Sequence, residues 1–371
     1  MSDTVIVTNK GSTRVDNTTT QLTYIQILRF VASTLVVIFH AIGTGGYVTQ
    51  HEDSKVIDVL AYGGHGVDLF FVISGFIIYY STHTLVKTPQ MFLWRRAERI
   101  IPIYWFMYLL LIVIYVVAPS AFKSTEWFNF RFMFESMFFV SFIDGHLPAV
   151  FVGWSLEYEM FFYLSVSFLL LRKEKAWDEL IVIFALLVML NAMPVPPRFE
   201  TVHGFFTNPL ILEFIFGIIV ARIFIGKHTS KLAMAFVVVS LLSVAWMDHS
   251  NRAIAAGLPS TILVAAGAYL SKSRSRPSWF EKALARLGDA SYSTYLLQIF
   301  VISAAGKYLP RIYPLSWGMF IATTTLLTIS SGYILFMFVE RPLLNMCRRF
   351  RPGQARRASP PLSASATSID R

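Results

Sequence analysis

The sequence predicts an all-α membrane protein: a bundle of about ten transmembrane helices with both termini in the cytoplasm. Two observations predict this class. Of the 371 residues, 55% are hydrophobic and 15% are charged, and the mean hydropathy is +0.57. The apolar residues also gather in repeated runs of about 20, the length that a helix needs to cross a bilayer, rather than in amphipathic stripes.

The expected spans follow one another along most of the chain. They cover 22–43, 66–84, 100–118, 148–171, 178–196, 209–225, 231–247, 257–271, 288–306 and 316–338. The run 257–271 is short for a span. The apolar stretch 130–143 is expected to be a half-buried or re-entrant segment between two spans.

The distribution of basic residues predicts the orientation. With the N-terminus inside, the cytoplasmic segments hold 24 Lys and Arg residues and the outer loops hold 7, and Arg29 inside a span completes the 32. This asymmetry places both termini in the cytoplasm. It also accounts for the net charge of +10 without a nucleic-acid partner, because the basic residues flank membrane helices.

Three regions follow from the span pattern. We expect a polar cytoplasmic segment at 1–21, a membrane domain at 22–342 and a basic, disordered cytoplasmic tail at 343–371. The single cysteine, Cys347, excludes an intrachain disulfide and a metal site built from cysteines.

The first span carries two ionisable side chains where hydrocarbon is the rule. Arg29 and His40 stand eleven residues apart in LTYIQILRFVASTLVVIFHAIG. At about 100° per residue this step ends about 20° from three full turns, so both groups lie on one helix face, about 16 Å apart along the axis. Given the orientation above, Arg29 lies in the cytoplasmic half and His40 near the outer end.

The chemistry of this pair indicates a functional route. Ionisable groups inside a membrane helix usually face a bundle interior or wet cavity. Histidine exchanges protons near neutral pH, and arginine stays charged and holds phosphate or carboxylate groups. The alternative interpretation is a histidine that only packs between helices and an arginine that reaches back to the inner interface.

Further polar residues lie near the outer level. His65 and Asp68 open the second span, where Asp68 either caps the helix or orients a protonated imidazole. Glu157 and Glu159 lie about 200° apart around the fourth span. One of them is therefore expected to face the bundle and the other a loop, a wet groove or a basic partner, unless both only make structural pairs.

On the inner side, basic residues precede the third span. The sequence FLWRRAERIIPIYWF places Arg95, Arg96 and Arg99 at its expected cytoplasmic mouth, followed by Tyr104 and Trp105. These arginines either only fix the membrane orientation or bind a phosphorylated, nucleotide-bearing donor.

Six motifs occur in order along residues 22–342. They are the spacing of Arg29 and His40, GVDLFFVISGFII at 66–78, the Arg96 and Arg99 pair before Pro102, WSLEYEMFFYL with Glu159, GDASYSTYLLQ at 288–298, and FVERPL at 338–343. In this combination the chain resembles the acyltransferase-3 family of membrane O-acyltransferases, especially its bacterial branch that acylates exopolysaccharides.

The resemblance implies an O-acyl transfer reaction. Its expected donor is cytoplasmic acyl-CoA, most often acetyl-CoA, used as a co-substrate, with no permanently bound cofactor and no metal. The acceptor would be a hydroxyl of a sugar or of a lipid-linked or polymeric glycan on the other side of a bacterial inner membrane. Polysaccharide assembly machinery and membrane lipid are the further expected partners.

The resemblance also implies residue roles. The histidine matching His40 is catalytic, the arginine matching Arg29 is needed for activity, and the arginines matching Arg96 and Arg99 handle the donor. We expect Asp68 or Glu159 beside the imidazole. The candidates for further polar lining are His65, Trp154, Tyr292 and Gln298.

One position departs from the family. Relatives commonly have His where this chain has Gln298, which hydrogen-bonds but does not titrate. His40 then acts either as general base on the acceptor hydroxyl or as a transiently acylated nucleophile. An extended pantetheine arm of about 15 to 20 Å is comparable with the rise of about 16 Å from Arg29 to His40.

Two other classes of protein fit the same composition. A secondary transporter or lipid-linked sugar flippase would use Arg29, His40 and Glu159 as a proton relay or anion site. A structural subunit of an export complex would need none of these groups for its function. The sequence leaves open the acceptor sugar, the modified hydroxyl, the length of the acyl group and the oligomeric state.

Overall fold

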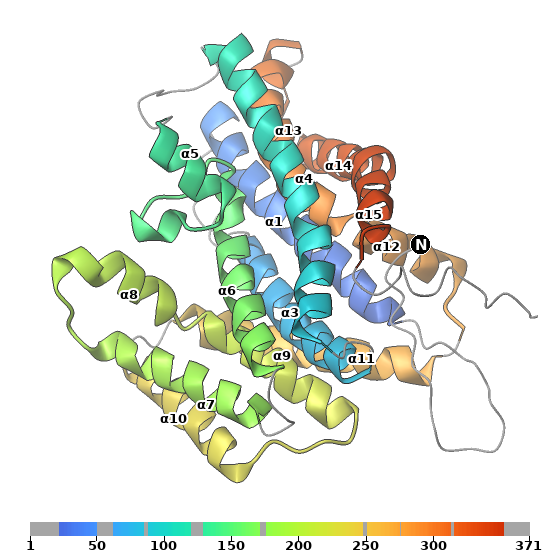
Figure 1. Cartoon of the computed structure of the whole chain (residues 1–371). Helices are drawn as coiled ribbons and strands as arrows, with labels where there is room; N and C mark the ends of the chain where they lie inside the picture. Colours follow the sequence, from blue (N-terminus) through green and yellow to red (C-terminus); the bar gives the residue numbers. More distant parts are fainter. Residues whose placement is uncertain are drawn as a thin grey trace, which may run out of the picture.

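The structure is a computed structural model that describes residues 22–49, 62–84, 88–119, 129–170, 176–247, 251–274, 276–312 and 315–351. The regular elements in these residues are helices, and no strand occurs among them (Figure 1). The all-α fold class is therefore confirmed for the described part of the chain.

The elements succeed one another as follows. The helices are α1 (Thr23–Thr49), α3 (Gly66–Thr84), α4 (Pro89–Val117), α5 (Phe130–Met137), α6 (Trp154–Leu169), α7 (Ala176–Met189), α8 (Glu200–Phe206), α9 (Ile211–Phe224), α10 (Lys231–Met247), α11 (Leu258–Ser273), α12 (Trp279–Asp289), α13 (Ser291–Ile312), α14 (Trp317–Leu335) and α15 (Arg341–Arg348). The short 3-10 turns are η1 (Tyr62–His65), η3 (Ser141–Ile143), η4 (Phe151–Gly153), η5 (Leu190–Ala192) and η6 (Pro197–Phe199), and π-helical turns form η7 (Ala253–Gly257) and η8 (Phe336–Glu340).

Six helical segments are long and apolar enough to cross a membrane. They are Thr23–Thr49, Gly66–His83, Pro89–Val117, Pro197–Phe224, Ala253–Ser273 and Trp317–Arg349. The chain is thus a membrane protein. The remaining predicted spans coincide with α6, α7, α10 and α13, of which α6 and α7 have 16 and 14 residues, fewer than the ~20 of a full crossing. The count of ten therefore stays a prediction.

Helix α4 begins earlier than expected, at Pro89 instead of residue 100. Thr88 caps it by accepting a hydrogen bond from the backbone N–H of Met91, and Pro89 occupies the first turn, where its missing N–H costs nothing. The arginines expected at the mouth of a span consequently lie on the helix itself.

The stretch 130–143, expected to be half-buried or re-entrant, forms the short helix α5, capped by Asn129 and followed by η3, and it mixes buried with exposed residues. The boundary expected at residue 343 for the disordered tail lies too early in the sequence. Arg341–Arg348 is helical, and Arg351 donates to both carboxylate oxygens of Glu98. Residues 1–21 and 352–371 lie outside the described residues.

Helices α3 and α9 cross at two glycines. A Cβ on Gly75 would lie 2.0 Å from the carbonyl oxygen of Phe214, and a Cβ on Gly217 would lie 2.0 Å from that of Val72. Only residues without a side chain permit this backbone approach, which is typical of membrane helix pairs. Helix α1 packs against α3, α11, α12, α13 and α14, so it runs through the bundle next to the elements that build the site (Figure 1).

Candidate active site

Helix α1 carries Arg29 and His40 on one uninterrupted helix, Thr23–Thr49. The same-face relation predicted from their spacing therefore applies to an actual helix, with a separation of about 16 Å along the axis. Arg29 is buried, with 9% of its surface exposed, and His40 is half-buried. The Arg29 guanidinium donates to the side-chain oxygen of Gln26 over 3.1 Å.

The imidazole of His40 meets the side chain of Gln298 on α13. Nδ1 of His40 lies 3.1 Å from Oε1 of Gln298, and the Gln298 amide nitrogen donates to the backbone carbonyl of Tyr295 over 2.8 Å. A carbonyl oxygen only accepts, so this second bond fixes the orientation of the amide and turns its oxygen toward the ring. We therefore assign the proton to Nδ1, which leaves the lone pair on Nε2.

This partner differs from the carboxylate that the sequence predicted. Asp68 is fully buried and is held instead by Arg252, whose Nε donates to both carboxylate oxygens over 2.9 Å and whose Nη2 donates to Oδ2 over 2.7 Å. The guanidinium fork matches a carboxylate better than a single ring nitrogen does. Nδ1 of His65 lies 3.5 Å from the same carboxylate. The prediction that Asp68 lies beside the imidazole of His40 is therefore wrong, because Asp68 pairs with Arg252.

The two glutamates of α6 occupy different surroundings, as their angular separation predicted. Glu157 accepts from the backbone N–H of Ser141 over 2.9 Å and from its hydroxyl, so it fastens η3 to the bundle. Glu159 is half-buried and accepts from Ser74 over 3.0 Å. It lies within electrostatic range of Arg29 and Arg99 rather than in contact with His40.

A solvent-open pocket lies at the Arg29 end of α1, and the empty space of about 550 Å³ around it includes open solvent. It is lined by Gln26, Arg29, Arg99, Asp289, Phe336, Glu340, Arg341, Leu344, Asn345 and Arg348. Four guanidinium groups thus converge against two carboxylates. The sequence identified Arg29 and Arg99 as candidates but missed Arg341 and Arg348, although Arg341 belongs to the FVERPL motif.

The other candidates for donor binding lie elsewhere. Arg95 and Arg96 do not line this pocket, and Arg96 donates to Ser81 over 3.2 Å and sits 5.9 Å from the ring centroid of Tyr163. Tyr104 donates to the carbonyl of Ser136 over 2.7 Å, and Trp105 to that of Met137 over 3.1 Å. Both aromatic residues therefore hold the end of α5.

The other two predicted lining residues, Tyr292 and Trp154, also make contacts between elements. Tyr292 donates to the carbonyl of Ile100 over 3.2 Å and so joins α13 to α4. The ring of Trp154 lies 6.0 Å from the guanidinium carbon of Arg252. Arg252 was not identified from the sequence, because its partner Asp68 lies 184 residues away.

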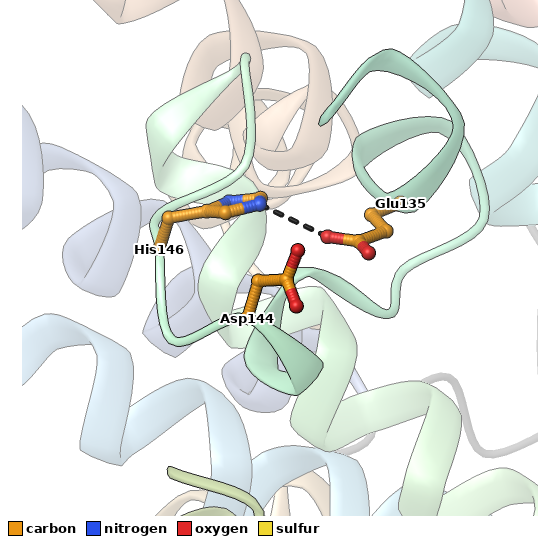
Figure 2. A group of neighbouring side chains, drawn as sticks. All are labelled: Glu135, Asp144 and His146. Atoms are coloured by element: carbon orange, nitrogen blue, oxygen red, sulfur yellow. Dashed lines mark hydrogen bonds and ion pairs between the residues drawn. The ribbon is translucent and has the colours of Figure 1, made fainter. Parts of the chain in front are cut away.

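One group of side chains outside these sites has the composition of a metal site. The ligand atoms of Glu135, Asp144 and His146 lie within 4.8 Å of one another, and Figure 2 shows the three side chains converging, with His146 bonded to Glu135 over 3.0 Å. Arg131 forms ion pairs with both carboxylates. The guanidinium and the imidazole thus occupy both oxygens of Glu135 and Oδ1 of Asp144, and the group joins the loop after η3 to α5.

The described helices form an integral membrane protein, with a half-buried imidazole at one end of α1 and a basic pocket at the other. The family model described as "Acyltransferase domain" matches residues 22–337, and the chain therefore belongs to the acyltransferase-3 family. This confirms the resemblance inferred from the six motifs.

Two curated relatives align over most of the chain. The "Exopolysaccharide production protein ExoZ" of Rhizobium meliloti (strain 1021) is 29% identical over 334 residues, which are 85% of this chain and 98% of the relative. The "Acyltransferase MdmB" of Streptomyces mycarofaciens is 23% identical over 362 residues, covering 88% of this chain and 92% of the relative. No solved structure matches the chain.

Proposed function

We propose that this chain transfers an acetyl group from cytoplasmic acetyl-CoA to a hydroxyl of an exopolysaccharide or other cell-surface glycan, in a bacterial inner membrane. The observation that carries the proposal is the arrangement on α1: a pocket rich in arginines at Arg29 and an oriented imidazole at His40, on one helix face. The name of the relative from Rhizobium meliloti supports the glycan acceptor.

The pocket suits the nucleotide end of the donor. Arg29, Arg99, Arg341 and Arg348 line it, and guanidinium groups bind phosphates with paired hydrogen bonds. The pantetheine arm, about 15 to 20 Å long, then reaches along α1 over the rise of about 16 Å to His40. Donor and acceptor would in this way meet at the His40 end without the nucleotide crossing the membrane.

The chemistry at His40 needs one base. Nε2 takes the proton of the acceptor hydroxyl. At the same time the hydroxyl oxygen attacks the thioester carbonyl, and the C–O bond forms. The tetrahedral intermediate collapses, the C–S bond breaks, and the CoA thiolate takes the proton from Nε2. Gln298 keeps Nδ1 protonated, so that Nε2 is the nitrogen that takes up the proton and then releases it.

The test uses the purified protein in lipid nanodiscs with radiolabelled acetyl-CoA and glycan from the host. We expect acetyl transfer to the glycan, a loss of about 10²- to 10⁴-fold with His40→Ala, and weaker acetyl-CoA binding with Arg99→Ala. Trp246→Ala, at an 87% exposed position on α10, serves as the control.

The same preparation separates the other two classes of protein. Vesicle uptake of labelled glycan without acetyl transfer would indicate a carrier. Full glycan export and acylation in cells that produce His40→Ala at normal abundance would indicate a structural subunit, and either result would overturn the proposal.

A further inference from the structure

Arg252 makes a further hydrogen bond beyond its ion pair with Asp68. Besides its bonds to Asp68, its Nη2 donates to the carbonyl of Gly64 over 2.8 Å. Its remaining nitrogen, Nη1, finds no hydrogen-bond partner in the described part of the chain, while 35% of the side chain is exposed. An immobilised guanidinium thus presents two N–H donors at the open side of a buried carboxylate.

Trp154 lies against this guanidinium and presents a further donor. The guanidinium carbon is 6.0 Å from its ring centroid, and the residue is half-buried. The indole N–H donates to no group among the described residues. A fixed aromatic surface beside several hydrogen-bond donors is an arrangement that suits a sugar ring, whose C–H face packs on an aromatic ring while its hydroxyls accept hydrogen bonds.

Two chains of contact join this pair to His40. On one side, the ring of Phe151 lies 5.3 Å from the imidazole, and Phe151 belongs to η4, which leads directly into α6 at Trp154. On the other side, the ring centroid of Phe39 lies 5.2 Å from that of the imidazole, and the ring lies 3.7 Å from the position that a Cβ on Gly64 would take; the carbonyl of Gly64 accepts from Arg252. The pair therefore lies at the His40 end of α1, away from the basic pocket.

The charges around Arg252 indicate the class of ligand. Asp68 matches the guanidinium charge, and the buried carboxyl of Glu213 lies within electrostatic range of both. No excess positive charge is left to attract a carboxylate or phosphate. A neutral group that accepts hydrogen bonds fits this environment better than an anion.

We propose that Arg252 and Trp154 form an acceptor subsite that binds a neutral sugar ring of the glycan beside His40. The proposal rests on the proposed acyl transfer to a glycan. The sugar packs on Trp154, and Nη1 of Arg252 donates to a ring hydroxyl, so that a neighbouring hydroxyl reaches Nε2 of His40.

Two conservative variants separate this role from a structural one. Arg252→Lys keeps a positive charge opposite Asp68 but lacks Nη1, and Trp154→Phe keeps an aromatic face but lacks the N–H and the larger ring. Trp246→Ala is the matched control, because Trp246 lies on α10 and is 87% exposed.

The experiment measures acetyl transfer from acetyl-CoA to octyl β-glucoside and to octyl β-glucuronide, in nanodiscs free of sugar detergent. For the unchanged protein we expect a lower KM for the neutral glucoside. Arg252→Lys and Trp154→Phe should raise that KM about tenfold and leave the KM for acetyl-CoA unchanged, and Trp246→Ala should change neither constant.

The outcomes distinguish the two proposals. A preference for the glucuronide, no transfer to the glucoside despite transfer to host glycan, or an unchanged glucoside KM in both variants would overturn the acceptor subsite alone. Failure of acetyl transfer to every acceptor, host glycan included, would overturn the proposed function.

Discussion

At the scale of single residues, the neutral partner of His40 sets this site apart from a triad with a carboxylate. In such triads the carboxylate both selects the tautomer of the histidine and stabilises the imidazolium. Gln298 provides only the first of these, through its fixed amide oxygen. The carboxylates of Glu159 and Asp68 bind other groups.

Exchange of Gln298 tests the orientation of the ring. Gln298→Glu keeps an acceptor at the same place, and we expect it to retain transfer within about tenfold. Gln298→Met has a similar size but no acceptor, so the ring loses its preferred tautomer and kcat should fall about 10²- to 10⁴-fold with an unchanged KM for acetyl-CoA. Steady-state kinetics of both variants measure this, and equal kcat values would contradict the assigned proton position.

Glu281 at the start of α12 gives a pH prediction. The hydroxyl of Tyr24, the backbone N–H of Ser278 and the charge of Arg274 lower the pKa of the Glu281 carboxyl from 4.5 to about 2. A pKa that is lower in the folded state contributes stability above the unfolded pKa, and this contribution is lost as the pH falls through the range from about 4.5 to about 2. The free energy of unfolding should therefore decrease as the pH falls from about 4.5 to about 2.

The measurement is the melting temperature in detergent as a function of pH. Glu281→Gln should melt below the unchanged protein at pH 7, and the difference should shrink as the pH falls toward about 3. Lys282→Gln at the neighbouring position is the control. A difference that stays constant from pH 7 to pH 3 would argue against the ionised carboxylate as the stabilising group.

At the scale of elements, the contact of α3 with α9 depends on two glycines. In Gly217→Ala the added Cβ meets the carbonyl of Val72, and the helices have to separate. We expect the free energy of unfolding to fall by about 1 to 3 kcal/mol, as it does when a packed core is overfilled. Thermal unfolding in detergent checks it against Gly204→Ala, where nothing lies within 4 Å of the new Cβ; equal melting temperatures would show that the crossing tolerates a side chain.

The elements themselves were largely predictable, because their signals are local. Each expected span overlaps a helix, and α3 begins and ends at the expected residues 66 and 84. The early start of α4 was missed because the apolar run begins only near residue 100, while the cap at Thr88 and Pro89 lies among polar residues.

The partners within the site were less predictable, because they join distant parts of the chain. The spacing of Arg29 and His40 was readable from helical geometry alone. The contact of His40 with Gln298 spans 258 residues, and no local pattern indicates it. For the same reason Arg252 was missed.

At the scale of the whole molecule, transfer between two compartments requires a definite orientation. We propose ten spans and cytoplasmic termini, following the distribution of basic residues. Alkaline phosphatase, which needs disulfides and so folds only outside the cytoplasm, should be inactive when fused after Arg371 and active when inserted after Pro196. The reverse pattern, or activity at both sites, would contradict this orientation.

The single helix α1 also limits how the chain can change in length. One residue inserted between Arg29 and His40 turns everything beyond it by about 100°, so that the imidazole leaves Gln298 and faces another part of the bundle. Insertions in the connections between helices leave both groups in place. Among related sequences, variation in length should therefore accumulate in the connections and be absent from the ten residues between these two side chains.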